Sequence, residues 1–504
     1  MNTTDDYQLL PDYLSIYKQL MKDFITKLSV GGLLITLVYW LGYETLRSDF
    51  PQLITLYGTF FLIYLGLFYF STTQKNITFF VGMGVLARFL LLFTIPNFSD
   101  DLYRFIWDGR LLTQGINPFD HLPSYYIENK HTIPGLTNEL YQQLNSPNYF
   151  TIYPPVNQVI FAVATGLFPN SIWGSSLVMK SCLFAFEIGS IFLMIQLLQH
   201  FKLPAKNVLL YALNPLIIIE ITGNIHFEGA MIFFLLLAIW LIAVKKRWVL
   251  SAIAFALSVA SKLLPLMFLP LMVRRIGKTE SSTTPANAIG SEQGFGNIKA
   301  LYPLKRLVSF VKSRIVLKEW LGLDWKRIIA YFSIIGFTLI GLFIPLINGV
   351  FLTNFGDSLN LYFQKFEFNG SLYYFFRWIG FQVKGYNIIG TLGPVLALSA
   401  LTGIILITLL EAKTDWSKLF ERMLFAVCCY LFCSATVHPW YVAMPIVFCV
   451  FTRFRFPILW SGLIFLTYIN YSYGDYFENL WVVGIEYILV FVYLIYELSD
   501  WNKS

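Results

Sequence analysis

Charged residues are scarce in this sequence. Asp, Glu, Lys and Arg make up 13% of the 504 residues, whereas hydrophobic residues make up 57%. Soluble proteins average about 25% charged residues, so a soluble globular protein is excluded. The length would suit roughly three soluble domains, but repeated apolar runs approach the ~20 residues that cross a bilayer. We therefore expect residues 1–504 to form one all-α, polytopic membrane domain.

Metal-ligand patterns are also lacking. The five cysteines all lie within apolar runs, and none shares a helical turn with a histidine. We interpret them as packing residues; they are Cys182, Cys428, Cys429, Cys433 and Cys449. No cofactor is firmly implied. A divalent cation, Mg²⁺ or Mn²⁺, held by adjacent carboxylates and water stays an open alternative.

Basic residues are few and occur in short clusters between apolar runs. The formal net charge is +7, and this placement follows the positive-inside rule, so it indicates membrane orientation and not a nucleic-acid partner. Residues 1–27 are polar and acidic before they become basic, which predicts that no signal peptide is cleaved. No internal repeat is visible, which disfavours a transporter with duplicated halves.

The apolar runs predict about fourteen crossings, some of half length. They lie near residues 30–45, 51–70, 77–96, 172–200, 207–222, 229–244, a hairpin at 248–273, and 327–347, 388–410, 419–436, 440–453, 457–471 and 480–498. The placement of Lys and Arg then puts both termini in the cytoplasm. Residues 154–169 are expected to form an interfacial helix, because a crossing there would carry Lys202 and Lys206 to the outside.

Two long polar regions interrupt this pattern. Residues 97–170 are expected to face outward. Residues 274–326 are expected to be cytoplasmic, and they combine a Ser-, Thr- and Gly-rich piece with a basic amphipathic piece. We expect the first piece to be disordered and the second to lie on anionic lipid.

The outer region opens with SDDLYRFIWDGRLL, in which Asp101, Arg104 and Asp108 recur at helical spacing. This pattern predicts an amphipathic helix at the membrane interface. Asp100 and Asp101 have two readings. They suit the first turn of a helix, where capping and the helix dipole favour carboxylates; alternatively, one of them acts as a general base. Arg104 and Asp108 similarly suit either a surface ion pair or a reaction site.

Three further polar stretches are expected on the same side. They are GNIHFEG (223–229), YFQKFEFNGSLYYFFRW (362–378) and TVHPWY (436–441), with Lys262 at the top of its hairpin. A charge at mid-bilayer costs ~2.5 to 3.5 kcal/mol, so polar groups kept beside spans are functional candidates. Structural alternatives remain open for each, namely a polar turn, a snorkelling lysine, a solvated loop and an aromatic belt.

The order of these motifs resembles that of the GT-C glycosyltransferases, and more narrowly that of bacterial polyprenyl-phosphate-mannose-dependent mannosyltransferases. The similar motifs run from about residue 97 to residue 441 and are SDDLYRFIWDGRLLTQGINPF, YPPVNQVIFA, GNIHFEG, SKLLPLMFLPL, FEFNGSLYYFFRW and TVHPWY. Three spans precede the acidic loop here, where the simplest GT-C layout has one, but the odd number keeps the site on the same side.

The expected fold is a GT-C-like bundle of about 12–14 transmembrane helices. The resemblance implies a lipid-phosphate sugar donor, an inverting transfer and an acidic residue of the first loop as base. On this chain the catalytic candidates are therefore Asp100 and Asp101, with Asp100 preferred as the base. The candidates for binding the donor phosphate are Lys262, Arg104 and Arg377. Candidates for binding substrate are Asp108, Arg110, Tyr153, His226, Glu228, Lys365, Asn369 and His438.

The expected partners are a polyprenyl-phosphate sugar donor, a glycan or glycolipid acceptor, and membrane lipid. The expected location is a bacterial cytoplasmic membrane, with the site facing outward. A non-catalytic flippase of lipid-linked sugars is the main alternative, and a lipid-linked glycan polymerase or ligase is a second. A transporter would more naturally place its essential charges within spans than in a long outer loop.

Overall fold

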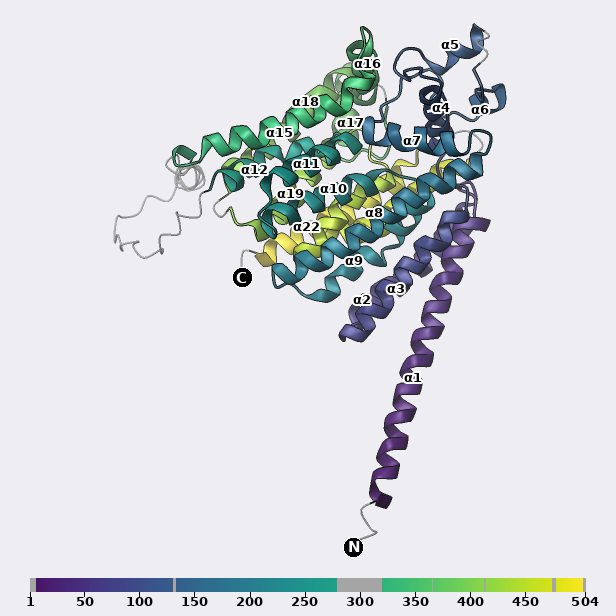
Figure 1. Ribbon diagram of the computed structural model, residues 1–504, viewed down its shortest axis with the longest axis vertical. Coiled ribbons are helices and arrows are strands. Elements are labelled where there is room, and N and C mark those ends of the chain that lie inside the picture. The colour runs from purple at the N-terminus through teal and green to yellow at the C-terminus, as the bar shows by residue number, and fades with distance from the viewer. Residues whose placement is uncertain are drawn as a thin grey trace.

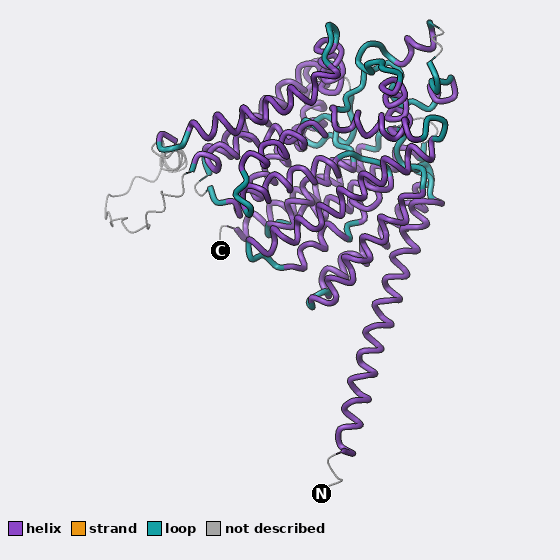
Figure 2. Tube along the Cα trace, viewed as in Figure 1, coloured by secondary structure: helices purple, strands orange, loops and turns teal. Residues whose placement is uncertain are grey.

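The chain is almost entirely helical. The computed structural model describes residues 6–129, 133–278, 320–364, 366–411, 414–473 and 477–501. Within these ranges there is no β-strand, and one isolated bridge joins Phe368 to Thr436. Figure 2 shows helices throughout, with the longer loop stretches among the helices of the outer loop. The prediction of an all-α polytopic membrane protein is confirmed.

Seven helices in the described ranges are long and apolar enough to cross a membrane. Three precede the outer loop: Phe24–Glu44 within α1 (Asp6–Tyr39) and η1 (Trp40–Glu44), α2 (Phe50–Phe70), and Gln74–Phe93, which joins α3 (Gln74–Leu90) to η2 (Leu91–Phe93). The others are α8 (Ile172–His200), Trp325–Leu346 in α15 (Trp325–Phe343) and η7 (Ile344–Leu346), α18 (Ile389–Leu409), and Leu480–Asp500 within α22 (Leu480–Trp501). All seven match predicted spans to within six residues at each end, with the largest difference at the start of the first span.

The remaining predicted crossings are shorter, charged near one end, or bent. The shorter elements are α10 (Glu228–Ala243), α11 (Trp248–Ser261), η5 (Leu264–Phe268), α12 (Leu269–Gly277), η8 (Pro439–Val442), α20 (Ala443–Phe451), α21 (Phe456–Leu463) and η9 (Ile464–Tyr471). α19 (Trp416–Cys433) is longer but carries three charged residues in its first half. Fourteen predicted crossings thus correspond to seven full-length helices plus these elements and one bent pair.

That bent pair corrects the expectation of a straight span over residues 207–222. η3 (Ala205–Val208) and α9 (Leu209–Ala212) meet η4 (Ile217–Gly223) at an angle of 56°. Pro215 has no backbone N–H to continue α9. The Asn214 side chain accepts the backbone N–H of Leu216 at 3.0 Å, which starts the next helix in a new direction.

The outer loop folds onto one end of the bundle. α4 (Asp101–Thr113), α5 (Pro123–Glu128), α6 (Asn138–Gln142) and α7 (Pro155–Leu167) gather there, whereas the N-terminal end of α1 extends far away from it (Figure 1). We call this end of the bundle the loop end. The short helices α16 (Phe351–Gln364) and α17 (Leu372–Lys384) follow α15. The predicted cytoplasmic loop falls largely on residues 279–319, which are outside the described ranges.

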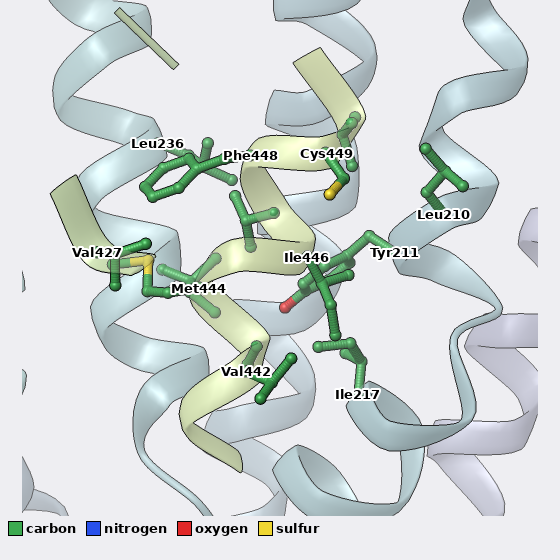
Figure 3. Close-up of a cluster of buried hydrophobic side chains, with 14 of the residues drawn as sticks. Leu210, Tyr211, Ile217, Leu236, Val427, Val442, Met444, Ile446, Phe448 and Cys449 are labelled. Atoms are coloured by element: carbon green, nitrogen blue, oxygen red, sulfur yellow. The ribbon is translucent and has the colours of Figure 1, made fainter. Parts of the chain in front are cut away.

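The apolar core explains why short helices such as α9, α10 and α20 stay in the bundle. Apolar side chains from α9, α10, α19 and α20 interdigitate around α20, where Met444, Ile446 and Phe448 have no exposed surface (Figure 3). A second apolar cluster lies beneath the loop; it joins Phe105 and Trp107 of α4 to Phe161 of α7 and Met179 of α8. Burial of this cluster fixes the loop helices on the bundle.

α4, which its pattern predicted to be an amphipathic helix at the membrane interface, is covered by the rest of the protein on both sides. Trp107 and Asp108, which lie next to each other in the sequence, both have 0% exposure, so its polar and apolar sides are both covered. The rest of the loop folds over the polar side through Arg104, and periodicity in α4 carries no information about that cover. α7, by contrast, keeps exposed apolar side chains at Val159, Val163 and Leu167, as an interfacial helix requires.

Candidate functional site

Asp100 stands at the start of α4 but does not cap it. It occupies the N-cap position with φ −92° and ψ 2°, and its side chain makes no capping hydrogen bond. Arg47 instead donates from Nη2 to Asp100 Oδ2 at 2.5 Å. The Asp100 side chain keeps 39% of its surface exposed. The capping interpretation of this carboxylate is therefore wrong, and an ion pair with the η1–α2 turn takes its place.

Asp101 faces different partners. Asn145 donates from Nδ2 to Asp101 Oδ1 at 2.6 Å, and the Tyr153 side chain also hydrogen-bonds to this carboxylate. Burial raises the pKa of Asp101 above its usual value, while these hydrogen bonds and the positive charge of Lys262 partly offset the effect and Glu228 adds to it. Asp101 thus lies within electrostatic range of two residues from α10 and α11.

Lys262 joins three of the predicted motifs. It is the C-cap of α11, and its ammonium pairs with the carboxylate of Glu228, the first residue of α10. The ammonium also lies 4.4 Å from the ring centroid of Tyr441 in η8, a cation–π arrangement. The Lys262 side chain remains 34% exposed, whereas that of Glu228 is only 5% exposed. One positive charge therefore reaches the surface from a buried polar junction.

Two histidine rings contact the Trp440 ring beside this junction. The ring centroids of His226 and His438 lie 3.7 Å and 4.5 Å from that of Trp440. Burial, reinforced by the charge of Lys262, lowers the pKa of both histidines, that of His438 to about 3. Both imidazoles are therefore neutral near pH 7. Among the described residues, His226 Nε2 and His438 Nδ1 are buried without a hydrogen-bond partner.

Other candidates from α4 hold the loop in place. Arg104 donates to Asp108 Oδ1 at 2.9 Å and to the carbonyl oxygens of Ser146 and Tyr149 at 3.0 and 2.8 Å. Asp108 also accepts from Gln158 in α7 at 3.1 Å. The Arg104 and Asp108 side chains are 3% and 0% exposed, so the alternative of a surface ion pair is wrong.

Arg110 similarly ties α4 to the loop. It is 8% exposed and donates to the Gly135 carbonyl at 2.5 Å. Arg104, Asp108 and Arg110 are buried, and their hydrogen bonds hold the loop together. The proposed reaction site therefore does not include them.

Arg377 lies in a separate polar cluster. It pairs with Glu367 and stands 4.3 Å from the ring of Tyr374. Asn369 is buried with φ 51°, and it donates its backbone N–H to Glu478 at 2.5 Å and its Nδ2 to Glu486 at 3.1 Å. These contacts hold this segment in place. The proposed reaction site therefore does not include Arg377 or Asn369. Lys365 lies outside the described residues.

The same segment is attached to TVHPWY by backbone hydrogen bonds. Phe368 donates to Ala435 at 3.0 Å and accepts from Val437 at 2.8 Å. The C-terminal half of the chain thereby positions His438 and its neighbours Trp440 and Tyr441 at the loop end. Sequence reasoning missed Arg47 and Asn145, since each is a single polar residue in a turn without a recognisable pattern. Within the described ranges, no group of three or more His, Cys, Asp or Glu residues is placed to hold a metal ion.

The fold and the site together define a class of protein: a polytopic helical membrane protein whose first long loop brings one carboxylate of an acidic pair, Asp101, within electrostatic range of Lys262 at one end of the bundle. Comparison with known sequences is more specific. The sequence model described as alpha-(1->6)-mannopyranosyltransferase, N-terminal domain, matches residues 15–277, and the chain belongs to this family. The matched segment contains Asp100, Asp101, Tyr153, Glu228 and Lys262. The resemblance inferred from the motifs is confirmed.

A curated relative agrees. Alpha-(1->6)-mannopyranosyltransferase A of Mycobacterium tuberculosis (strain ATCC 25618 / H37Rv) is 23% identical over 184 residues, which cover 36% of this chain and 34% of the relative. The match therefore spans about a third of that relative's length. No solved structure matches the chain.

Proposed function

We propose that the protein transfers a mannosyl residue from a polyprenyl-phosphate donor to a hydroxyl of a glycan or glycolipid acceptor on the extracytoplasmic face. Family membership supports the class of reaction. The observation that carries the proposal is that Asp101, Glu228 and Lys262 come from distant segments and interact electrostatically at the loop end. A reaction at a membrane surface needs such a charged site beside helices that accommodate a lipid tail.

Lys262 is the proposed group for the donor phosphate. Its ammonium has three donors, and Glu228 and Tyr441 fix its position without covering it. When the bond between the sugar and the lipid phosphate breaks, its electron pair stays on a phosphate oxygen. A preorganised positive charge stabilises that developing negative charge, and it does so most strongly where surrounding groups exclude water.

Asp100 is the proposed general base. Its exposed carboxylate can be reached by an acceptor hydroxyl, whereas Asn145 and Tyr153 hold Asp101 in one orientation. In the proposed step the acceptor oxygen bonds to the anomeric carbon, the bond to the phosphate oxygen breaks, and the hydroxyl proton passes to Asp100. Attack opposite the leaving phosphate inverts the anomeric configuration. Asp101 acts by orienting the acceptor beside the base.

The test compares Asp100→Asn and Asp101→Asn in a transfer assay with labelled polyprenyl-phosphate mannose. Loss of general-base assistance costs ~10²- to 10⁴-fold in rate, so we expect Asp100→Asn to lose activity in this range. Because Asp100 makes no capping bond, its removal should not unfold α4.

Asp49→Asn is the matched control. Asp49 caps α2 by accepting the backbone N–H of Gln52 at 3.2 Å, and Asn caps about as well as Asp. We expect normal activity from this variant. Near-normal turnover in both Asp100→Asn and Asp101→Asn would remove the basis of the catalytic assignment. Movement of the donor across vesicles without sugar transfer would instead support the flippase.

A further inference from the structure

A cavity of about 440 Å³ opens beside the acid pair. Three segments line it: the turn between η1 and α2, the residues before α4, and the chain at the end of η9. The lining residues are Leu46, Arg47, Ser48, Asn97, Asn470, Tyr471 and Tyr473. Its volume falls within the ~300–1,000 Å³ of small-ligand sites. Arg47 links it to the proposed reaction site, because the same guanidinium pairs with Asp100.

The chemistry of the lining favours a neutral, hydroxyl-rich ligand. The side-chain amides of Asn97 and Asn470 and the hydroxyls of Ser48 and Tyr473 lie in the lining, and the Tyr473 ring adds an apolar surface. The Tyr471 ring stacks instead with the Arg47 guanidinium, 5.0 Å from its centroid. Of the seven lining residues only Arg47 is charged, and Asp100 balances it at 2.5 Å. A phosphate would find no unbalanced positive charge among these residues. A sugar ring, with hydroxyls around its edge and C–H groups on its faces, fits both kinds of lining group.

Asn470 supplies an independent indication that a ligand belongs here. Its side chain is 1% exposed, and its Oδ1 accepts the backbone N–H of Asn479 at 3.0 Å, which fixes the orientation of the amide. Its Nδ2 is then buried without a partner among the described residues. A buried amide donor left unpaired is unfavourable and rare in native proteins. A ligand hydroxyl in the cavity would provide the missing acceptor.

We propose that this cavity binds the sugar ring of the acceptor that carries the attacking hydroxyl. The inference rests on the proposed function and adds a division of the site. Asp100 pairs with Arg47, which lines the cavity, whereas Asp101 interacts with Tyr153 and Lys262. The acceptor sugar therefore approaches the acid pair from the η1–α2 turn, and the donor phosphate lies toward α10 and α11.

Two variants test the cavity in the purified, full-length protein. Asn470→Asp keeps the oxygen that accepts from Asn479 but removes the unpaired donor. Tyr473→Ala removes an aromatic wall that is already 38% exposed, so the fold should tolerate it. Each should raise the KM for the acceptor about tenfold, the usual effect of losing one buried hydrogen bond or ring contact, while the donor KM changes less than twofold. Tyr69→Ala, at a 73% exposed tyrosine near the far end of α2, is the matched control.

A binding measurement without donor separates this inference from the proposed function. Saturation-transfer NMR should detect short α-1,6-linked mannose oligosaccharides on the wild-type protein, and both variants should lose the signal while Tyr69→Ala keeps it. If transfer occurs but both variants keep the wild-type acceptor KM and signal, the cavity assignment is overturned and the proposed function stands. Displacement of the oligosaccharide by millimolar inorganic phosphate would also overturn it, in favour of an anion site. If the wild-type protein binds the oligosaccharide but transfers no mannose, the proposed function fails and the sugar site survives.

Discussion

Gly109→Ala tests whether the close contact between α4 and α7 positions the acid pair. A Cβ added at Gly109 would lie 2.7 Å from the Phe161 carbonyl carbon and from Thr165 Oγ1, and nearer still to the Phe161 carbonyl oxygen. These atoms belong to the backbone and to a buried threonine, so neither can turn aside. α4 must therefore move away from α7, and it would carry Asp100 and Asp101 with it.

The size of the effect follows from two opposing terms. Alanine favours a helix over glycine by ~0.5–1 kcal/mol, whereas overpacking costs ~1–3 kcal/mol. We expect a net loss of about 1–2 kcal/mol in the free energy of unfolding. Restoring ordinary contact requires a shift of about 1 Å, and a displacement of that size can cost ~10²-fold in rate. Thermal unfolding in detergent and the transfer assay measure the two losses.

Gly166→Ala is the matched control for this prediction. Gly166 lies in α7 and also faces α4, but the nearest atom to an added Cβ would be Thr113 Cγ2 at an ordinary 3.7 Å. This variant should be as stable and as active as the wild-type protein. Equal behaviour of Gly109→Ala and Gly166→Ala would refute the role given to the close contact.

Three further predictions concern charge and orientation. Lys262→Met leaves the buried carboxylate of Glu228 without its partner and should lower the Tm. The double variant Lys262→Met, Glu228→Gln should fold normally but bind the donor weakly. An unchanged donor KM in the double variant would contradict the role given to Lys262 in phosphate binding. The pKa of His438 is lowered from 6.5 to about 3, so between these pH values the imidazole is protonated in the unfolded chain but neutral in the folded protein. The free energy of unfolding should therefore fall as pH drops from 6.5 toward 3. In His438→Gln the Tm should depend less on pH over this range. A plot of Tm against pH that runs parallel to that of the wild-type protein would disprove this prediction. Cysteines introduced at Ser124 and Ser282 should be labelled from opposite sides of the membrane, and labelling of both from one side would refute the proposed orientation.

Apolar periodicity predicted the helices well because the bilayer imposes a length on each crossing. It also located the break at Lys262, where a charge and then Pro265 interrupt an apolar run. The bend after Asn214 was missed, although the Asn-Pro pair is a visible signal for it. The arrangement of polar groups was harder to predict. Arg104 binds carbonyl oxygens 42 and 45 residues away, in a loop that has no periodic pattern from which such a contact could be inferred.

The pairing of Phe368 with the TVHPWY segment has a consequence for chimeric proteins. The segment that defines the family ends at residue 277, yet Trp440 and Tyr441, which contact His226 and Lys262, lie well beyond it. An N-terminal fragment would keep both carboxylates and the lysine but lose the aromatic rings that contact Lys262 and His226. Exchanging the C-terminal half between relatives should therefore alter both the aromatic contact of Lys262 and the C-terminal wall of the proposed acceptor cavity, while leaving Asp100 and Asp101 in place. Substrate selectivity and the reacting carboxylates can thus evolve on separate parts of one chain.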